Sequence, residues 1–172
     1  VTAVNEAPIT LTTQDAETIG AAFDTASASF AAAFAAAVST STYGAVGAGT
    51  TVVNAWNLTV DNATSGLSSD GQPITLAKVG NDVVGTTTVG AVVSEIFRIS
   101  VATDGTVTLK QSAEVDHVGA GNNLQIALAS GKVSLNATAT ITDGDGDVDT
   151  KPVSVDLGGN IRFDDDVPTL TV

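Results

Sequence analysis

Residues 132–142 read KVSLNATATIT, and this stretch decides the fold class. Apolar side chains occupy every second position from Val133 to Ile141, and Ser, Asn and Thr fill the positions between them. Successive side chains of a strand point to opposite faces of its sheet, so the alternation predicts a strand with one buried and one hydrated face. The buried face needs a second layer to cover it, which favours an all-β fold.

Similar segments recur on both sides of this stretch. The predicted strands are residues 8–13, 51–60, 73–79, 92–102, 106–110, 153–157 and 161–163. Asp104-Gly105 separates two of them and is typical of a two-residue hairpin turn. Short strands with turn signals between them predict a β-sandwich, and 172 residues suit one domain.

An Ala-rich segment before Val38 departs from the β pattern. Phe30, Phe34 and Val38 are spaced four residues apart, so one short helix near residues 27–37 would place all three on one face. Either residue of the Asp24–Thr25 pair would cap this helix. The alternative is a loose crossover that packs its Phe rings on a sheet.

The charge of the chain limits its partners. The formal net charge is −13, with only 6 Lys and Arg residues, so the basic surface that nucleic-acid binding needs is absent. No apolar run approaches the roughly 20 residues of a membrane-spanning helix, so no membrane insertion is expected. Cations suit such a charge, and the alternative is that it serves solubility alone. With no cysteine for disulfides, a bound metal is the expected substitute.

The sharpest candidate metal site is the segment TDGDGDVD at residues 142–149. Its carboxylates are Asp143, Asp145, Asp147 and Asp149, which would repel one another on the face of a regular strand. A bent Gly-rich loop can turn several of them onto one calcium ion, which takes six to eight oxygen ligands and tolerates irregular geometry. The spacing matches no EF-hand loop. The alternative is an acidic, solvated hairpin turn.

Further candidate calcium ligands lie toward the two ends of the chain. Asp164, Asp165 and Asp166 precede Pro168, and Glu6 precedes a proline at the other end. The expected division is an N-terminal linker at residues 1–8, a sandwich module at 9–163 and an acidic C-terminal linker at 164–172 that leads into a next module. Calcium shared across that joint would fix the angle between modules. The alternative is a frayed acidic terminus.

Asp15, at the start of the Ala-rich segment, completes the set of candidate metal ligands. The chain begins with Val1 rather than Met, and we expect it to be a piece of a longer exported protein.

An enzymatic activity is not predicted. His117 follows Asp116, but no nucleophile on a G-x-S-x-G turn accompanies this pair, so His117 is interpreted as a structural hydrogen-bond donor. A glycoside hydrolase would need two convergent carboxylates, and such sites usually carry aromatic platforms. Trp56 and Tyr43 offer little of that kind.

The sequence resembles the repeat modules of giant RTX-type adhesins exported by type I secretion in Gram-negative bacteria. The residues that carry the resemblance are FAAAF at 30–34, YGA at 43–45, VDH at 115–117, ATATITDGDGD at 137–147 and GGNIRFDDDVP at 158–168.

The resemblance implies an immunoglobulin-like sandwich, monomeric in isolation, repeated in tandem along an extracellular rod at the bacterial surface. Such a rod spaces ligand-binding domains from the cell in adhesion and biofilm formation, and calcium rigidifies its linkers. Val46 departs from the family, which tends to carry an acidic residue there, so a metal ligand at that position is not expected. The second hypothesis is a calcium-dependent module that binds carbohydrate or protein directly, with residues 15–49 as the place for such a surface.

Overall fold

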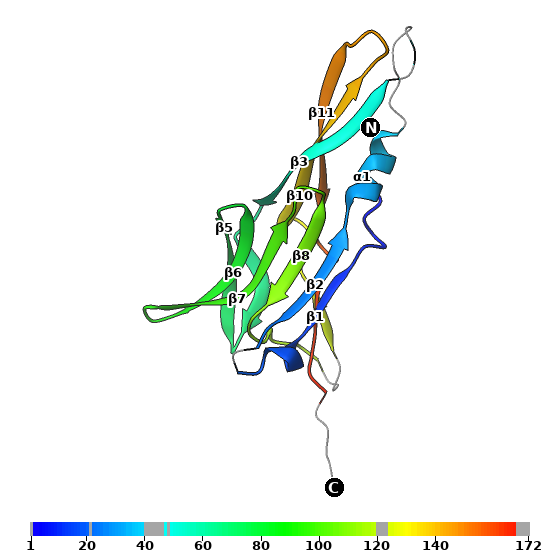
Figure 1. Cartoon of the computed structure of the whole chain (residues 1–172). Coiled ribbons are helices and arrows are strands. Elements are labelled where there is room, and N and C mark those ends of the chain that lie inside the picture. Colours follow the sequence, from blue (N-terminus) through cyan, green and yellow to red (C-terminus); the bar gives the residue numbers. More distant parts are fainter. Residues whose placement is uncertain (1, 21, 40–46, 48, 120–123, 168–172) are drawn as a thin grey trace.

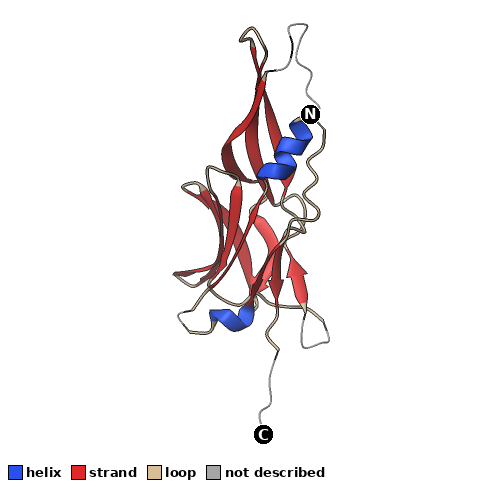
Figure 2. Cartoon of the chain, turned by 45° about the vertical axis from the view of Figure 1, so that its right-hand side comes forward, coloured by secondary structure: helices blue, strands red, loops and turns tan. Residues whose placement is uncertain are grey.

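Twelve strands form three hydrogen-bonded sheets in the computed structural model, which describes residues 2–20, 22–39, 47, 49–119 and 124–167. The expected all-β sandwich with one short helix is confirmed (Figures 1 and 2). Residues 40–46, 48 and 168–172, which include the YGA motif, Val46 and Pro168, lie outside the described residues.

The largest sheet has six strands in the order β2-β8-β7-β6-β5-β4, and all neighbours are antiparallel. Its strands are β2 (Asp24–Ser29), β4 (Thr64–Ser69), β5 (Gln72–Val79), β6 (Asp82–Val89), β7 (Val92–Val101) and β8 (Thr106–Gln111). The hairpin predicted at Asp104-Gly105 joins β7 to β8, but its turn is longer than the two residues predicted. The amide of Ala102 donates to the Thr106 carbonyl, so three residues lie between this pair, and the Gly105 amide donates to the Ala102 carbonyl.

Two smaller sheets complete the sandwich. One has the order β11-β10-β3 and is built from β3 (Thr50–Val60), β10 (Val133–Thr142) and β11 (Val148–Asp156). The other has the order β1-β12-β9 and is built from β1 (Leu11–Gln14), β9 (Gln125–Ala127) and β12 (Ile161–Asp164). β1 and β12 pair in parallel, with Leu11 opposite Ile161, so the first and last strands run in the same direction.

The predicted alternation of β10 is confirmed. Val133, Leu135, Ala137 and Ala139 are buried, and the Ser, Asn and Thr residues between them are half-buried. The core contains four fully buried Phe rings, and two of them, Phe97 and Phe163, pack with ring centres 5.1 Å apart; the other two are Phe30 and Phe34. These rings compensate for the small side chains that make up most of the remaining apolar interior.

The Ala-rich segment forms a helix, α1 (Ala31–Val38), that is shorter than predicted. Phe34 and Val38 are buried as expected, but the proposed capping by Asp24 or Thr25 is wrong, because both residues lie in β2. Phe30 occupies the N-cap position without a side-chain cap. The residues before α1, where the first helical turn was predicted, form a strand instead, because β2 pairs along its whole length with β8.

The first strand begins later than predicted. The amide of Ile9 donates to the carbonyl of Glu6 at 2.8 Å, which closes a turn around Pro8 and delays the strand to Leu11. Proline also lacks the amide that a ladder needs. The segment before this turn lies against the domain: Val4 is buried and the amide of Thr2 donates to the carbonyl of Ala37.

The two poles of the molecule differ. At one pole, the far end of the β3-β10-β11 sheet projects beyond the core, so that β11 is exposed from Val148 to Pro152 and buried only at Val153 and Val155 (Figure 1). We call the part formed by residues 139–151 the acidic arm. The chain leaves at the opposite pole, next to the 3-10 helix Asp15–Thr18. The part of the chain that the structure describes contains no helix with the length and apolar character needed to cross a membrane.

Candidate metal centres

The tip of the acidic arm is a tight turn organised by one carboxylate. Asp143 Oδ1 accepts hydrogen bonds from the backbone amides of Asp147 at 2.9 Å and Asp145 at 3.3 Å. The Asp143 amide in turn donates to the Asp147 carbonyl at 3.0 Å. Aspartate is favoured in such turns because its short side chain accepts from amides two to four residues on. Gly146 has φ +96°, which an L side chain would adopt only with strain.

Three of the four predicted ligands of this segment come together. Oxygen atoms of Asp143, Asp145 and Asp147 lie within 4.8 Å of one another, at a largely exposed position. The pKa of Asp143 is lowered, first by a hydrogen bond with the Asp145 carboxyl and then by the backbone amides that it accepts. Asp149 leaves the group because it lies on β11, where it pairs with Lys151 at 3.6 Å.

A second cluster lies at the opposite pole and surrounds Asp15. This residue follows β1 and is only 8% exposed. Its Oδ1 atom accepts hydrogen bonds from the side-chain amide of Gln111 and from the backbone amide of Val115, the latter at 3.1 Å. Burial raises the pKa of Asp15, and these two hydrogen bonds oppose the rise.

His117 faces Asp15 from the segment that follows β8. Its Nε2 atom lies 3.0 Å from the Phe163 carbonyl on β12, and its Nδ1 atom lies 3.4 Å from Asp15 Oδ2. The side chain is 4% exposed. This contact with the carbonyl is of the kind expected of a structural hydrogen-bond donor. No local pattern indicated that His117 also faces Asp15, because the two residues are distant in the chain.

Asp165, in the segment where the chain leaves the domain, lies beside Asp15 and His117. Its Oδ1 atom lies 4.0 Å from His117 Nδ1, and its amide donates to the Leu124 carbonyl at 2.8 Å. Ligand atoms of Asp15, His117 and Asp165 all lie within 4.8 Å of one another. We call these three residues the polar triad.

The other predicted ligands lie outside both groups. Asp164 accepts a hydrogen bond from the Gln125 side chain at 2.7 Å, and Asp166 is exposed beside a pocket that Asp15 also lines. Glu6 is half-buried, and its backbone carbonyl accepts from the Asn160 side chain at 3.0 Å. Within the described residues, Asp164, Asp166 and Glu6 therefore join no three-residue cluster.

More carboxylates surround the polar triad. The pKa of Glu114 is raised, first by a hydrogen bond shared with Asp70, then by burial and by the neighbouring negative charges. Asp116 accepts from the Gly71 amide at 2.9 Å. Among the described ion pairs, Asp15 and Asp165 contact His117 and no lysine or arginine. This pole therefore concentrates negative charge that a bound cation would offset.

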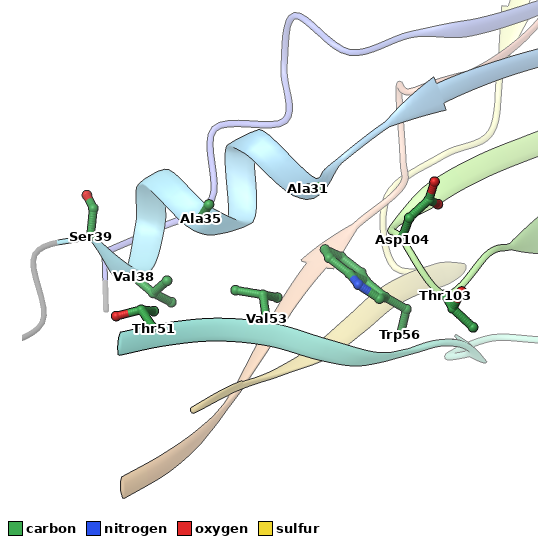
Figure 3. Close-up of a pocket in the computed structure, with 9 residues that line it drawn as sticks. All are labelled: Ala31, Ala35, Val38, Ser39, Thr51, Val53, Trp56, Thr103 and Asp104. Carbon is green, nitrogen blue, oxygen red and sulfur yellow. The ribbon is translucent and has the colours of Figure 1, made fainter. Parts of the chain in front are cut away.

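A third feature is a groove of about 500 Å³ between α1 and β3, lined by both apolar and polar side chains. Figure 3 shows Trp56 at one end of it, with Ala35 and Val38 of α1 facing Val53 of β3. The Trp56 ring packs against Phe34 with ring centres 4.7 Å apart. This groove includes part of the segment where a binding surface was expected.

Fold and sites together define an all-β sandwich domain with clustered carboxylates at both poles. The chain belongs to the family described as Domain of unknown function (DUF5801), whose model matches residues 3–158. This match includes the acidic arm and two members of the polar triad, Asp15 and His117. No curated protein and no solved structure matches the chain.

Proposed function

We propose that this domain is a calcium-stabilised structural extender module of a large extracellular adhesin at a bacterial cell surface. It spaces ligand-binding domains from the cell in adhesion and biofilm formation. The observation that carries the proposal is the parallel pairing of β1 with β12, which sends the chain out of the module in the direction in which it entered. Tandem copies joined in this way form an extended rod without reversing direction.

The location of the carboxylates supports calcium at the joints of such a rod. The acidic arm and the chain exit lie at opposite poles (Figure 1), so the exit of one copy meets the arm pole of the next. Asp143, Asp145 and Asp147 of one module then approach Asp164 and Asp166 of its neighbour. Carboxylates gathered at one joint repel one another unless cations neutralise them. Calcium can do so because it coordinates many carboxylate oxygens at once.

The energetics suit a secreted domain. Extracellular calcium modules bind with dissociation constants of about 10⁻⁴–10⁻³ M, so they are empty in the cytosol and filled outside. Binding to the native state alone stabilises it by mass action. Bound calcium would stabilise this cysteine-free chain in a second way, because it also reduces the self-repulsion that comes from a net charge of −13.

A thermal melt of the single module in excess EGTA, in millimolar calcium and in millimolar magnesium tests the metal dependence. We expect calcium, and not magnesium, to raise the melting temperature. The double variant Asp145→Asn/Asp147→Asn should lose part of this gain. Asp149→Asn is the matched control, because Asp149 pairs with Lys151 and should keep the gain. An equal melting temperature in EGTA and calcium would contradict the proposal.

The groove beside Trp56 favours a second candidate function, a calcium-dependent carbohydrate- or protein-binding module of the same kind of adhesin. Trp56 is half-buried and borders the groove, and aromatic side chains are common in the lining of ligand sites. A glycan array probed in calcium, with Trp56→Leu as the comparison, tests it. Binding that the substitution removes would favour this candidate over the extender.

A further inference from the structure

The protonation of the His117 ring is fixed at one of its two nitrogens. A backbone carbonyl can only accept, so the Nε2 atom, 3.0 Å from the Phe163 carbonyl, carries a hydrogen. The Nδ1 atom then either carries a second hydrogen, which makes the ring a cation, or presents a lone pair.

The surroundings of Nδ1 suit neither state without a further partner. A charged ring would draw a carboxylate oxygen to about 2.7–2.9 Å. The nearest oxygens, on Asp15 and Asp165, lie 3.4 and 4.0 Å away, and the described residues give Nδ1 no hydrogen bond. A neutral ring would aim its lone pair at two carboxylates, which is repulsive when both are ionised. A cation held between the three atoms removes both difficulties.

We propose that the polar triad, Asp15, His117 and Asp165, binds a divalent transition-metal ion of the zinc class, at a site separate from calcium. The ligand atoms are His117 Nδ1, Asp15 Oδ2 and Asp165 Oδ1. Ligands at about 2.0–2.1 Å from a tetrahedral zinc ion lie roughly 3.3 Å apart. The 3.4 Å separation of the first two atoms matches this spacing, and Asp165 closes on the ion by a small side-chain movement.

The choice of metal follows from the imidazole nitrogen. Calcium and magnesium take oxygen ligands, whereas imidazole nitrogen suits zinc and its neighbours in the first transition row. An exposed carboxylate loop such as the tip of the acidic arm has no nitrogen ligand and no such preference. The two poles therefore discriminate between two classes of ion.

The proposed ligands are oriented by hydrogen bonds to neighbouring residues, as is common for metal ligands in proteins. A metal-binding histidine commonly donates its other N–H to a carbonyl or carboxylate, and ligating carboxylates accept further hydrogen bonds. His117 donates to Phe163, while Asp15 Oδ1 accepts from Gln111 and Val115 and leaves Oδ2 directed at the ring. Both ligands are thus oriented before an ion arrives.

One ligand of the site borders the surface of the domain. A pocket of about 400 Å³ is lined by Asp15, together with Glu114 and Asp166. The negative charge of Glu114 interacts with Asp15, which favours a cation at this position.

The ion would join three segments that are far apart in the chain: the end of β1, the segment after β8 and the exit after β12. The exit is held here by one backbone hydrogen bond, from Asp165 to Leu124, and by the Asp164–Gln125 contact. A metal bond to Asp165 would fix the direction in which the chain leaves the domain. This inference does not depend on calcium binding elsewhere.

The test begins with protein stripped by a chelator and titrated with Co²⁺ and Zn²⁺ in millimolar calcium. We expect one Co²⁺ per chain with the visible absorption of a four-coordinate site, and displacement of this Co²⁺ by Zn²⁺ but not by calcium. His117→Gln should abolish the spectrum. Asp165→Asn should weaken Zn²⁺ binding at least about tenfold, since even outer-shell changes cost about 10–100-fold.

Two controls separate this site from its neighbours. Asp166→Asn removes an adjacent exposed carboxylate, and Asp145→Asn/Asp147→Asn removes the tip of the acidic arm; both should keep the Co²⁺ spectrum. In the unsubstituted protein, the ¹⁵N resonance of His117 Nδ1 should shift on adding Zn²⁺, a readout that needs no variant to fold. An unshifted resonance, or Zn²⁺ binding that survives both His117→Gln and Asp165→Asn, overturns the proposal while leaving the calcium melt unaffected.

Discussion

Replacing Gly105 by alanine should destabilise the domain for two separable reasons. Gly105 lies in the β7–β8 turn with φ +83°, a conformation that costs an L residue about 1–2 kcal/mol. An added Cβ would also lie 2.7 Å from Trp56 Cζ2 and 2.8 Å from Cε2. Phe34 packs against the same indole ring, so the ring cannot move in that direction without losing this contact.

The expected loss in free energy of unfolding is the sum of these two contributions. Overpacking at a well-packed site costs about 1–3 kcal/mol, so Gly105→Ala should cost about 2–5 kcal/mol in total. Gly131→Ala is the matched control, because Gly131 has φ +77° but open space around the added Cβ. It should show the backbone contribution alone, about 1–2 kcal/mol.

Urea unfolding followed by the fluorescence of Trp56, the one tryptophan of the chain, measures both variants. The emission of folded Gly105→Ala should also change, because its ring environment changes. In a Trp56→Leu background, followed by circular dichroism, the excess cost of Gly105→Ala over Gly131→Ala should disappear. Equal costs for the two variants in the native background would refute the steric reasoning.

Phe163→Ala should lower the free energy of unfolding by about 3–5 kcal/mol in urea titration, because the ring is fully buried and leaves a cavity. Arg98 donates two hydrogen bonds to Glu95 and so lowers the pKa of Glu95 below its ordinary value of 4.5. The pair therefore stabilises the fold above about pH 4.5 and loses this effect as the pH falls through the lowered pKa. Glu95→Gln should reduce the stability difference between about pH 7 and pH 3 by less than about 1 kcal/mol, since both groups are partly exposed; a larger drop would contradict the assignment. Asp143→Ala should speed amide hydrogen exchange at Asp147, whose amide it would leave without its side-chain acceptor, and unchanged exchange would argue against that turn.

The local patterns of the sequence predicted much of the fold. The alternation around Leu135 and the Asp-Gly hairpin turn are properties of neighbouring residues, so they could be read without the fold. β6 was not predicted, because Gly85 and a run of threonines weaken its apolar pattern. The structure gives the reason for this glycine: a Cβ there would lie 2.7 Å from the ring of Phe97. Close packing against Phe97 therefore requires glycine at position 85, although glycine has a low strand propensity.

The candidate sites also differ in whether neighbouring residues or the tertiary fold bring their ligands together. The structure brings together three carboxylates that are close in sequence, those of Asp143, Asp145 and Asp147. Asp149 lies apart from them because it belongs to β11. The meeting of Asp15 with His117 depends on where β1 lies relative to the segment after β8. No spacing rule connects residues that far apart, so only their chemistry as metal-ligand types was visible in the sequence.

We propose that the domain extends a rod whose joints are stiffened by calcium. Small-angle X-ray scattering of two tandem copies, joined through residues 164–172 and measured in millimolar calcium and in EGTA, tests this most directly. In calcium, we expect a narrow, elongated particle close to twice as long as one copy, and in EGTA a broader distribution of shorter distances. A pair folded side by side in calcium, or the same scattering in both conditions, would contradict it.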